Sequence, residues 1–300
     1  MKPELVVMAA GAGSRFGGLK QLEPVGPNGE KILDYALFDA RRAGVERVVF
    51  VIRKAFEQAF HQQVGCRYRK WMDVAYAFQE LDLLPQGFPL PGARSKPWGT
   101  AHAILAARGE TRSPFLAINA DDFYGRLCFE TLTRFLARPA RESAHAMAAF
   151  TLANTLSEHG TVARAVCTVG PTGLLQALEE HTGLERTADG IGERGPDGAY
   201  RRFSGQEPVS MNIWGFHPGI FDQLQEGFAR FLAGHGQDPG AEFALPTAVN
   251  ELIQAGRTKV LVLPTSDPWF GVTYREDKPT VVARIQALIE AGEYPVSLWS

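Results

Sequence analysis

The chain has 300 residues, 45% of them hydrophobic, and its formal net charge is −2 at pH 7. This length and hydrophobic content are enough for one large α/β domain, or for a core with an elaborated lobe. The charged residues form no basic run, which argues against a nucleic-acid surface. No stretch approaches the roughly 18 apolar residues of a membrane span.

The three cysteines, Cys66, Cys128 and Cys167, are odd in number and widely spaced, and no C-x-x-C occurs. Structural disulfides and a zinc knuckle are therefore not expected. The first residues also lack the charged and hydrophobic regions of a signal peptide. We expect a protein of the reducing cytoplasm, with no membrane partner and no nucleic-acid partner.

The first half of the sequence alternates apolar strand patterns with amphipathic helix patterns. Helices between nearly continuous apolar strands imply right-handed βαβ units and a parallel sheet. Residues 83–97 are rich in proline and glycine, and they predict a long loop over the sheet edge. The predicted strands are 4–10, 47–52, 74–78 and 114–119, and the predicted helices are 31–43, 54–63, 100–107 and 127–137.

After about residue 140 the pattern becomes richer in strands. Residues 182–206 are polar and hold six glycines, which predicts a mobile excursion. We predict an α/β fold, with a Rossmann-like, mostly parallel sheet, helices on both faces and a smaller β-rich lobe. Residues 1–140 form the core and residues 141–300 the lobe with C-terminal helices, packed as one continuous unit. The later strands are 146–152, 162–169, 174–180, 209–216 and 259–263, and the later helices are 219–232, 243–254 and 277–291.

A glycine-rich loop with two cations follows the first apolar strand. Gly11 and Gly13 begin it, two further glycines follow, and Arg15 and Lys20 add positive charge. Glycines let backbone N–H groups turn inward and approach a ligand closely. Such a loop at the carboxyl edge of a parallel sheet is typical of a phosphate-binding site. The loop therefore predicts a nucleotide, and the alternative is an ordinary glycine-rich turn with solvated charges.

Two of three known glycine-loop patterns fail here on spacing. The dinucleotide pattern needs glycine where Phe16 stands, and the P-loop pattern needs lysine where Leu19 stands. The third pattern resembles the opening signature of the sugar-phosphate nucleotidyltransferases, which make nucleotide sugars. Its positions are G-x-G-x-R, a lysine, and a proline four residues later, read here as Gly11, Gly13, Arg15, Lys20 and Pro24.

The resemblance implies roles for the residues of this loop. Ala10, Gly11 and Gly13 would bind the nucleotide through backbone amides. Arg15 would hold the departing phosphates, and Lys20 would stabilise the phosphate that is transferred.

Two adjacent carboxylates, Asp121 and Asp122, end the strand predicted at 114–119. Magnesium takes one or two carboxylates together with phosphate oxygens and water. Adjacent residues on a strand point to opposite sides, so we expect one aspartate to serve the metal and the other to cap the next helix. The resemblance assigns Asp121 as the catalytic, metal-binding residue. A helix cap with a solvated turn is the structural alternative.

Three further positions match the nucleobase contacts of the family. They are Gln79, after the third strand, and Gly99 and Thr100, in a G-T-A-like turn. Such a turn is by itself more often a helix start, with Thr100 as its cap.

The sugar-phosphate side matches the family at Gly160, Glu180 and Asn212, with His181 where a lysine is usual. His181 has two open interpretations, a phosphate ligand or a neutral hydrogen-bond partner. A second metal-binding acid is also missing, because Thr247 stands at its place, with Glu242 and Asn250 as substitutes. Gly271 likewise stands where an acid is common.

The resemblance implies a Mg²⁺-dependent transfer of a nucleoside monophosphate from a nucleoside triphosphate to a sugar 1-phosphate, with release of pyrophosphate. Two other readings remain: a cytidylyltransferase acting on a non-sugar phosphate, and a catalytically weak protein that only binds a nucleotide sugar. The base, the sugar and the oligomeric state stay open, and no interface for a homo-oligomer is legible.

Overall fold

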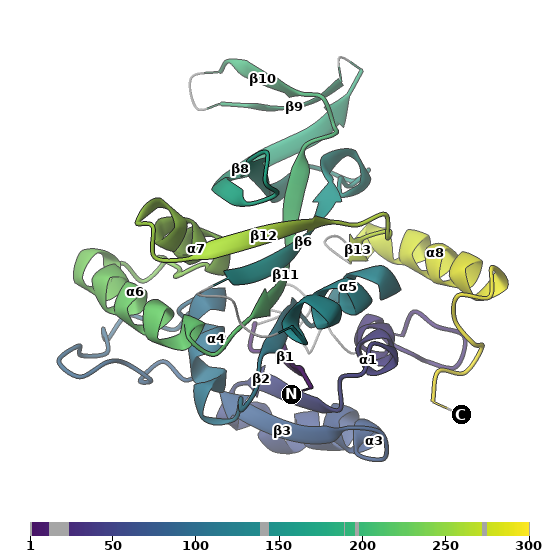
Figure 1. The fold of residues 1–300 in the computed structure, drawn as a ribbon, viewed down its shortest axis with the longest axis horizontal. Coiled ribbons are helices and arrows are strands. Elements are labelled where there is room, and N and C mark those ends of the chain that lie inside the picture. Colours follow the sequence, from purple (N-terminus) through teal and green to yellow (C-terminus); the bar gives the residue numbers. More distant parts are fainter. Residues whose placement is uncertain are drawn as a thin grey trace.

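The computed structural model describes residues 2–11, 24–138, 144–188, 190–195, 198–271 and 275–299. Within these residues an 11-stranded sheet runs through the molecule, with helices on both faces (Figure 1). Both faces are covered by apolar packing. Leu5 and Val7 belong to one buried cluster, and Val6 and Met8 belong to the other. The expected fold class, α/β with a mostly parallel central sheet and helices on both faces, is confirmed.

The core of the sheet consists of parallel strands in the order β3-β2-β1-β4. These strands read as nearly continuous apolar runs because side chains on both faces are buried. Their bounds are β1 Glu4–Met8, β2 Arg47–Ile52, β3 Asp73–Phe78 and β4 Phe115–Asn119.

Antiparallel strands extend this core beyond β4. Strand β11 pairs with β4 and β7 along one edge and with β6 along the other. On the shared edge, β4 pairs with residues 214–216 and β7 pairs with residues 209–210, so β4 and β7 lie end to end. The bounds are β6 Ala144–Thr151, β7 Val162–Val169, β11 Pro208–Phe216 and β12 Lys259–Pro264, with β12 parallel to β6.

The helices divide between the two faces of the sheet. The buried residues of α1 and α5 join one apolar cluster, and those of α4, α6 and α7 join the other. None of the helices in the described ranges is long and apolar enough to cross a membrane. The bounds are α1 Ile32–Arg42, α4 Thr100–Ala106, α5 Arg126–Leu136, α6 Ile220–His235, α7 Leu245–Gln254 and α8 Lys278–Glu290.

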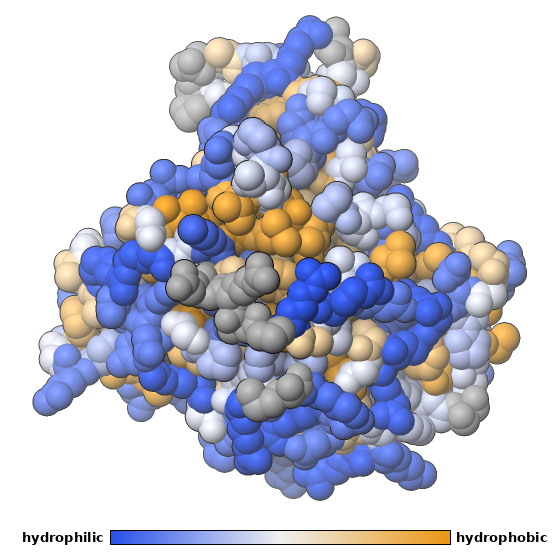
Figure 2. Space-filling view, in the orientation of Figure 1, coloured by the Kyte–Doolittle hydropathy of each residue, from blue (hydrophilic) through white to orange (hydrophobic). Residues whose placement is uncertain are grey.

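The described residues of segment 182–206, predicted as a mobile excursion, lie mostly in paired strands. Strand β8 (Leu175–Thr187) continues through it, and β9 (Gly190–Arg194) and β10 (Tyr200–Phe203) extend the sheet to one end of the molecule. This end has a mainly hydrophilic surface (Figure 2), because its strands carry many charged side chains. The apolar alternation that marks a strand is therefore weak in the sequence, although the backbone pairing is regular.

The helix predicted at 54–63 is present, but it extends further and changes type along its length. It consists of η2 (Lys54–Phe56), α2 (Glu57–Phe60), a π-helical turn (His61–Gly65) and α3 (Cys66–Tyr68), which follow one another without a break. The π-helical turn seats the Tyr76 hydroxyl, which lies 2.8 Å from His61 Nδ1. A Cβ at Gly65 would stand only 1.7 Å from that hydroxyl, so the turn requires glycine there.

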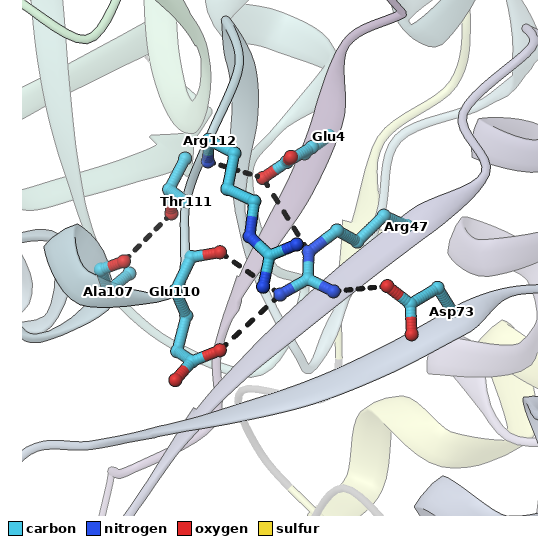
Figure 3. A network of polar contacts seen from close by, with 7 residues as sticks. All are labelled: Glu4, Arg47, Asp73, Ala107, Glu110, Thr111 and Arg112. Atoms are coloured by element: carbon cyan, nitrogen blue, oxygen red, sulfur yellow. Dashed lines mark hydrogen bonds and ion pairs between the residues drawn. The ribbon is translucent and has the colours of Figure 1, made fainter.

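An ion network holds together the amino-terminal ends of the parallel strands (Figure 3). The Arg47 guanidinium pairs with Asp73, lies 3.4 Å from Glu110 Oε2 and lies 3.9 Å from Glu4 Oε2. Glu4 also accepts the Arg112 N–H at 3.1 Å. These charges are paired with one another at the amino-terminal edge, whereas ligands of open α/β sheets bind at the carboxyl edge.

The C-terminal segment packs on α1 through a buried carboxyl group. The Tyr294 hydroxyl donates to Asp39 Oδ2 at 2.5 Å, and the Arg42 guanidinium lies 3.6 Å from Oδ1. Burial raises the pKa of Asp39 to about 7, and the Tyr294 hydrogen bond only partly offsets it. The folded protein therefore holds a proton on Asp39 that the unfolded chain releases near pH 4.

We expect the Asp39→Asn variant to flatten the pH dependence of stability. Because the folded pKa is raised, the wild type loses stability as the pH rises from about 4 to 7, by at most about 4 kcal/mol. Asparagine stays neutral and still accepts the Tyr294 hydrogen bond. Urea unfolding at pH 5 and pH 8 measures the difference, with exposed Asp82→Asn as the control. An unchanged pH slope in Asp39→Asn would contradict the assignment.

Candidate active site

A cavity of about 350 Å³ lies where β4 ends and β7 begins beside β11. The end-to-end arrangement of β4 and β7 leaves the middle of β11 without a neighbour on that edge, and polar side chains from several elements converge there. The polar residues of the lining are Asn119, Asp121, Asp122, Arg164, Glu180, Ser210 and Asn212, and Trp269 and Pro246 are among the others.

The paired aspartates lie at the wall of this cavity, as the sequence predicts for the carboxyl end of β4. Asp122 Oδ2 accepts hydrogen bonds from Asn119 Nδ2 at 2.8 Å and from the Tyr124 hydroxyl at 3.2 Å. Burial and the neighbouring Asp121 carboxylate raise the pKa of Asp122 to about 7. A cation bound beside the two carboxylates would relieve their repulsion.

Gly271 explains how Asp122 comes to be enclosed. Strand β5 (Asp122–Phe123) pairs with β13 (Phe270–Gly271), so that Gly271 lies opposite Asp122. A Cβ at Gly271 would stand 2.7 Å from Asp122 Oδ1. At this position, where the family often has an acid, any side chain would therefore require the Asp122 carboxylate to move.

The expected helix cap comes from a different residue. Asp267 Oδ2 accepts the Cys128 N–H in the first turn of α5 at 2.9 Å. Gly125 precedes this helix with φ +78°, and a Cβ there would stand 2.6 Å from the Asp267 side chain. The prediction that one of the two aspartates caps the helix is wrong for Asp122, whose carboxylate faces Asn119 and Tyr124 instead.

Asn212 enters the cavity from an irregular part of β11. The pairing of β11 with β6 shifts between Ser210 and Trp214, and Asn212 lies in that shift with φ +63°. Asparagine tolerates this left-handed conformation better than most residues. Its Oδ1 accepts the Trp214 indole N–H at 3.1 Å, and its Nδ2 donates to Asn119 Oδ1 at 3.4 Å. A hydrogen-bonded chain thus links Trp214, Asn212, Asn119 and Asp122.

The sequence-predicted sugar-phosphate residues do not all meet. Glu180 lines the cavity with Asn212, but His181 does not. His181 is buried against Phe203, with Nδ1 2.5 Å from Glu193 Oε1 and Nε2 3.7 Å from Glu179 Oε2. Of its two open interpretations, the structure supports the hydrogen-bond partner. Gly160 lies in a separate, larger hollow that shares Arg164 and Trp269 with this cavity.

The predicted nucleobase residues have structural partners of their own. Gln79 Nε2 donates to the Gly99 carbonyl at 2.8 Å, and Thr100 Oγ1 accepts the Leu245 N–H at the start of α7 at 2.8 Å. Gly99 has φ +108°, and a Cβ there would stand 2.6 Å from the Phe243 carbonyl oxygen. Neither Gln79, Gly99 nor Thr100 belongs to the cavity lining.

The substitutes considered for the missing second acid lie elsewhere. Glu242 pairs with Lys96 at 2.5 Å, and Asn250 Oδ1 accepts the Leu178 N–H at 2.9 Å. No cluster of three or more His, Cys, Asp or Glu side chains in the described ranges could hold a metal ion. The carboxylates among the lining residues of the cavity are Asp121, Asp122 and Glu180, and Mg²⁺ in proteins often takes only one or two carboxylates.

The glycine loop is described only at its beginning. Ala10 is buried and Gly11 is exposed just after β1. Gly13, Arg15 and Lys20 lie outside the described residues.

Sequence reasoning missed Arg164 and Trp269. The Arg164 side chain is buried in β7, and its guanidinium lies 4.7 Å from the centre of the Trp269 ring. An arginine at an inward position of an apolar strand is rare enough to have drawn attention to Arg164. Trp269 follows Pro268 directly before β13, and nothing in the sequence connects it with β7.

Residues 5–186 match the family model described as the MobA-like NTP transferase domain. A comparison with curated proteins gave no match. Among solved structures, the chain is similar to the inositol-1-phosphate CTP transferase from T. maritima, at a TM-score of 0.61 and 13% identity, over 95% of this chain and 96% of that one. It is also similar to a UDP-glucose pyrophosphorylase complexed with UDP-glucose, at a TM-score of 0.62 and 16% identity, over 96% and 99%. These two likenesses bear on the fold.

We expect Gly99→Ala to destabilise the protein more than Gly87→Ala does. Both glycines have positive φ, but Gly87 has open space where Gly99 meets the Phe243 backbone. The extra cost of the clash should be about 1–3 kcal/mol. Urea unfolding of both variants measures it, and equal destabilisation would show that the close approach to Phe243 is unimportant.

Proposed function

Since this chain belongs to the MobA-like NTP transferase family, we propose that it transfers a nucleoside monophosphate from a nucleoside triphosphate to a sugar 1-phosphate. The products would be a nucleotide sugar and pyrophosphate. The observation that carries the proposal is the cavity itself, which is lined by the adjacent carboxylates Asp121 and Asp122 together with the polar side chains of Glu180, Ser210 and Asn212.

The reaction is a direct displacement at the α-phosphorus. A phosphate oxygen of the acceptor would form the new bond, and the bond to the departing pyrophosphate would break on the opposite side. Such chemistry depends on positioning and on neutralising charge, rather than on a covalent intermediate. On the family pattern, the glycine loop would hold the triphosphate, Arg15 the departing phosphates and Lys20 the transferred phosphate.

The residues of the cavity fit a magnesium ion. Asp121 would hold it, with Asp122 close enough to share its charge, and the ion would supply neutralisation of the phosphates when bound. Asn119 and Tyr124 fix the orientation of the Asp122 carboxylate through hydrogen bonds.

The acceptor side favours a molecule with several hydroxyl groups. Glu180 offers a carboxylate acceptor, and Asn212 offers an amide held in place by Trp214 and Asn119. A carboxylate and an amide together pair well with vicinal hydroxyls. This composition supports a sugar or cyclic polyol phosphate over a small aminoalcohol phosphate, the acceptor class of the alternative cytidylyltransferase.

Pyrophosphate release with Mg²⁺ tests the proposal, across the nucleoside triphosphates and a panel of sugar 1-phosphates, polyol phosphates and aminoalcohol phosphates. Release that needs one particular pair would name both substrates. Release with an aminoalcohol phosphate alone would favour the cytidylyltransferase. Silence across the panel, with nucleotide-sugar binding by calorimetry, would favour a binding protein.

Lys20→Ala should lower kcat about 10²–10³-fold, the size expected on removing one donor to the transition state. Single-turnover kinetics with saturating substrates measure the chemical step. A folded Lys20→Ala protein with full activity would contradict the role of the loop.

Asp121→Asn should raise the Mg²⁺ concentration needed for half-maximal activity by more than about 10-fold, the usual cost of losing even an outer-shell partner. The exposed Asp222→Asn is the matched control. A magnesium titration of pyrophosphate release gives the comparison, and identical curves would remove Asp121 from the metal site.

A further inference from the structure

Arg164 is a buried cation at the wall of the cavity. Its side chain is 9% exposed, and three of its N–H groups bind main-chain carbonyls. Nε donates to the Thr155 carbonyl at 3.0 Å, Nη1 donates to the Ala163 carbonyl at 2.7 Å, and Nη2 also donates to Thr155. A guanidinium has five N–H donors, so these bonds leave part of its fork unused.

No carboxylate in the described ranges lies within ion-pair distance of Arg164, although the Asp122 charge attracts it from further away. Burial lowers the pKa of Arg164 to about 10, so the group remains charged at neutral pH. A buried charge without a partner is costly, and main-chain carbonyls compensate it only in part. The arrangement is one that an anion in the cavity would complete.

A second donor stands beside the guanidinium. The Trp269 ring lies under Arg164 at 4.7 Å, and Trp269 also lines the cavity. Trp269 is 7% exposed, and its indole N–H has no hydrogen-bond partner in the part of the chain that the structure describes. Buried indole N–H groups usually have a partner, so this donor too is suited to a ligand.

We propose that Arg164 and the Trp269 indole N–H bind the phosphate group of the acceptor, and thereby make a phosphomonoester the required acceptor. This inference rests on the proposed function. Arginine binds a phosphate through two parallel N–H groups, which selects for charge and for geometry. From that position the rest of the acceptor would extend toward Glu180 and Asn212, which line the same cavity.

The assignment also accounts for His181. This residue occupies the sequence position of the family's phosphate-binding lysine, but it is turned to Glu193 and Phe203. Arg164 lies directly opposite His181 in the β7–β8 pairing. A cation for the acceptor phosphate is thus supplied by Arg164 on β7, the strand that pairs with β8 at His181.

Arg164 also has a structural role, because it holds the Thr155 carbonyl after the turn at Leu152–Asn154. The test must separate this role from phosphate binding. Arg164→Met removes the charge, Arg164→Lys keeps it without the fork, and Trp269→Phe removes only the indole N–H and part of the ring. Arg201→Gln is the matched control, since Arg201 is an exposed arginine paired with Glu179.

The experiment uses the full chain with Mg²⁺ and the best substrate pair from the panel. Arg164→Met should raise the acceptor KM about 100-fold, the effect of losing two hydrogen bonds to a charged group. The KM for the nucleoside triphosphate should change less than about 3-fold, since those hydrogen bonds go to the acceptor alone. Arg164→Lys should recover part of the loss, and Trp269→Phe should raise the acceptor KM about 10-fold. Arg201→Gln should match the wild type.

Thermal unfolding with and without inorganic phosphate keeps the two proposals apart. Inorganic phosphate should raise the midpoint temperature of unfolding of the wild type and of Arg201→Gln, but not that of Arg164→Met. If Arg164→Met does not fold, Arg164→Lys takes its place, and its midpoint should rise less than that of the wild type. A wild type that releases no pyrophosphate but keeps this Arg164-dependent shift would overturn the proposed function alone. An active wild type whose folded Arg164 variants keep the acceptor KM, or raise both KM values equally, would overturn the role of Arg164.

Discussion

The antiparallel pairing of β11 with β4 is the constraint on which the site depends. Residues Trp214 to Phe216 pair with the first three residues of β4, while Val209 and Ser210 pair with β7 on the same edge. Between these pairings β11 shifts its register, and Asn212 adopts a left-handed conformation there. The gap so produced is the cavity. A regular β11 would close it by bringing β4 and β7 into a continuous edge.

The charged side chains at the amino-terminal edge of the sheet differ from those in the cavity in how they are paired. At the amino-terminal edge, Arg47 is surrounded by the carboxylates of Glu4, Asp73 and Glu110, which balance its charge within the protein. In the cavity, Asp121 and Asp122 stand side by side, and among the described residues Arg164 is held by main-chain carbonyls and the Trp269 ring, with no carboxylate at ion-pair distance. The first arrangement is complete without a ligand. The second would be completed by a cation next to the aspartates and an anion next to the arginine, which is the pair that a magnesium-bound phosphate substrate would bring.

Several site residues could be predicted from the sequence because their chemistry follows from local position. Asp121 and Asp122 end an apolar strand, and the carboxyl edge of a parallel sheet is where ligands bind. Glu180 and Asn212 were found through the family pattern, and they do meet in one cavity. The role of His181 could not be decided from the sequence. Its hydrogen-bond partner Glu193 belongs to a later strand, and the position of His181 next to Glu180 in the chain does not predict that pairing. Arg164 and Trp269 were missed, since their contact joins residues more than a hundred positions apart.

The sequence by itself determined the layered α/β architecture, because buried parallel strands and amphipathic helices impose distinct periods on the chain. It also determined the family, through a short glycine loop with fixed spacing. Only the tertiary structure decided why Gly99 must be glycine, since the atoms that exclude a Cβ belong to the Phe243 backbone, and only the tertiary structure places Gly271 against the Asp122 carboxylate. The tertiary structure likewise decided which charged side chains have an oppositely charged partner within the protein. The periodicity of the sequence reflects whether each residue is buried or exposed. The pairing of strands that are distant in the sequence determines which side chains come into contact, and a binding site depends on those contacts.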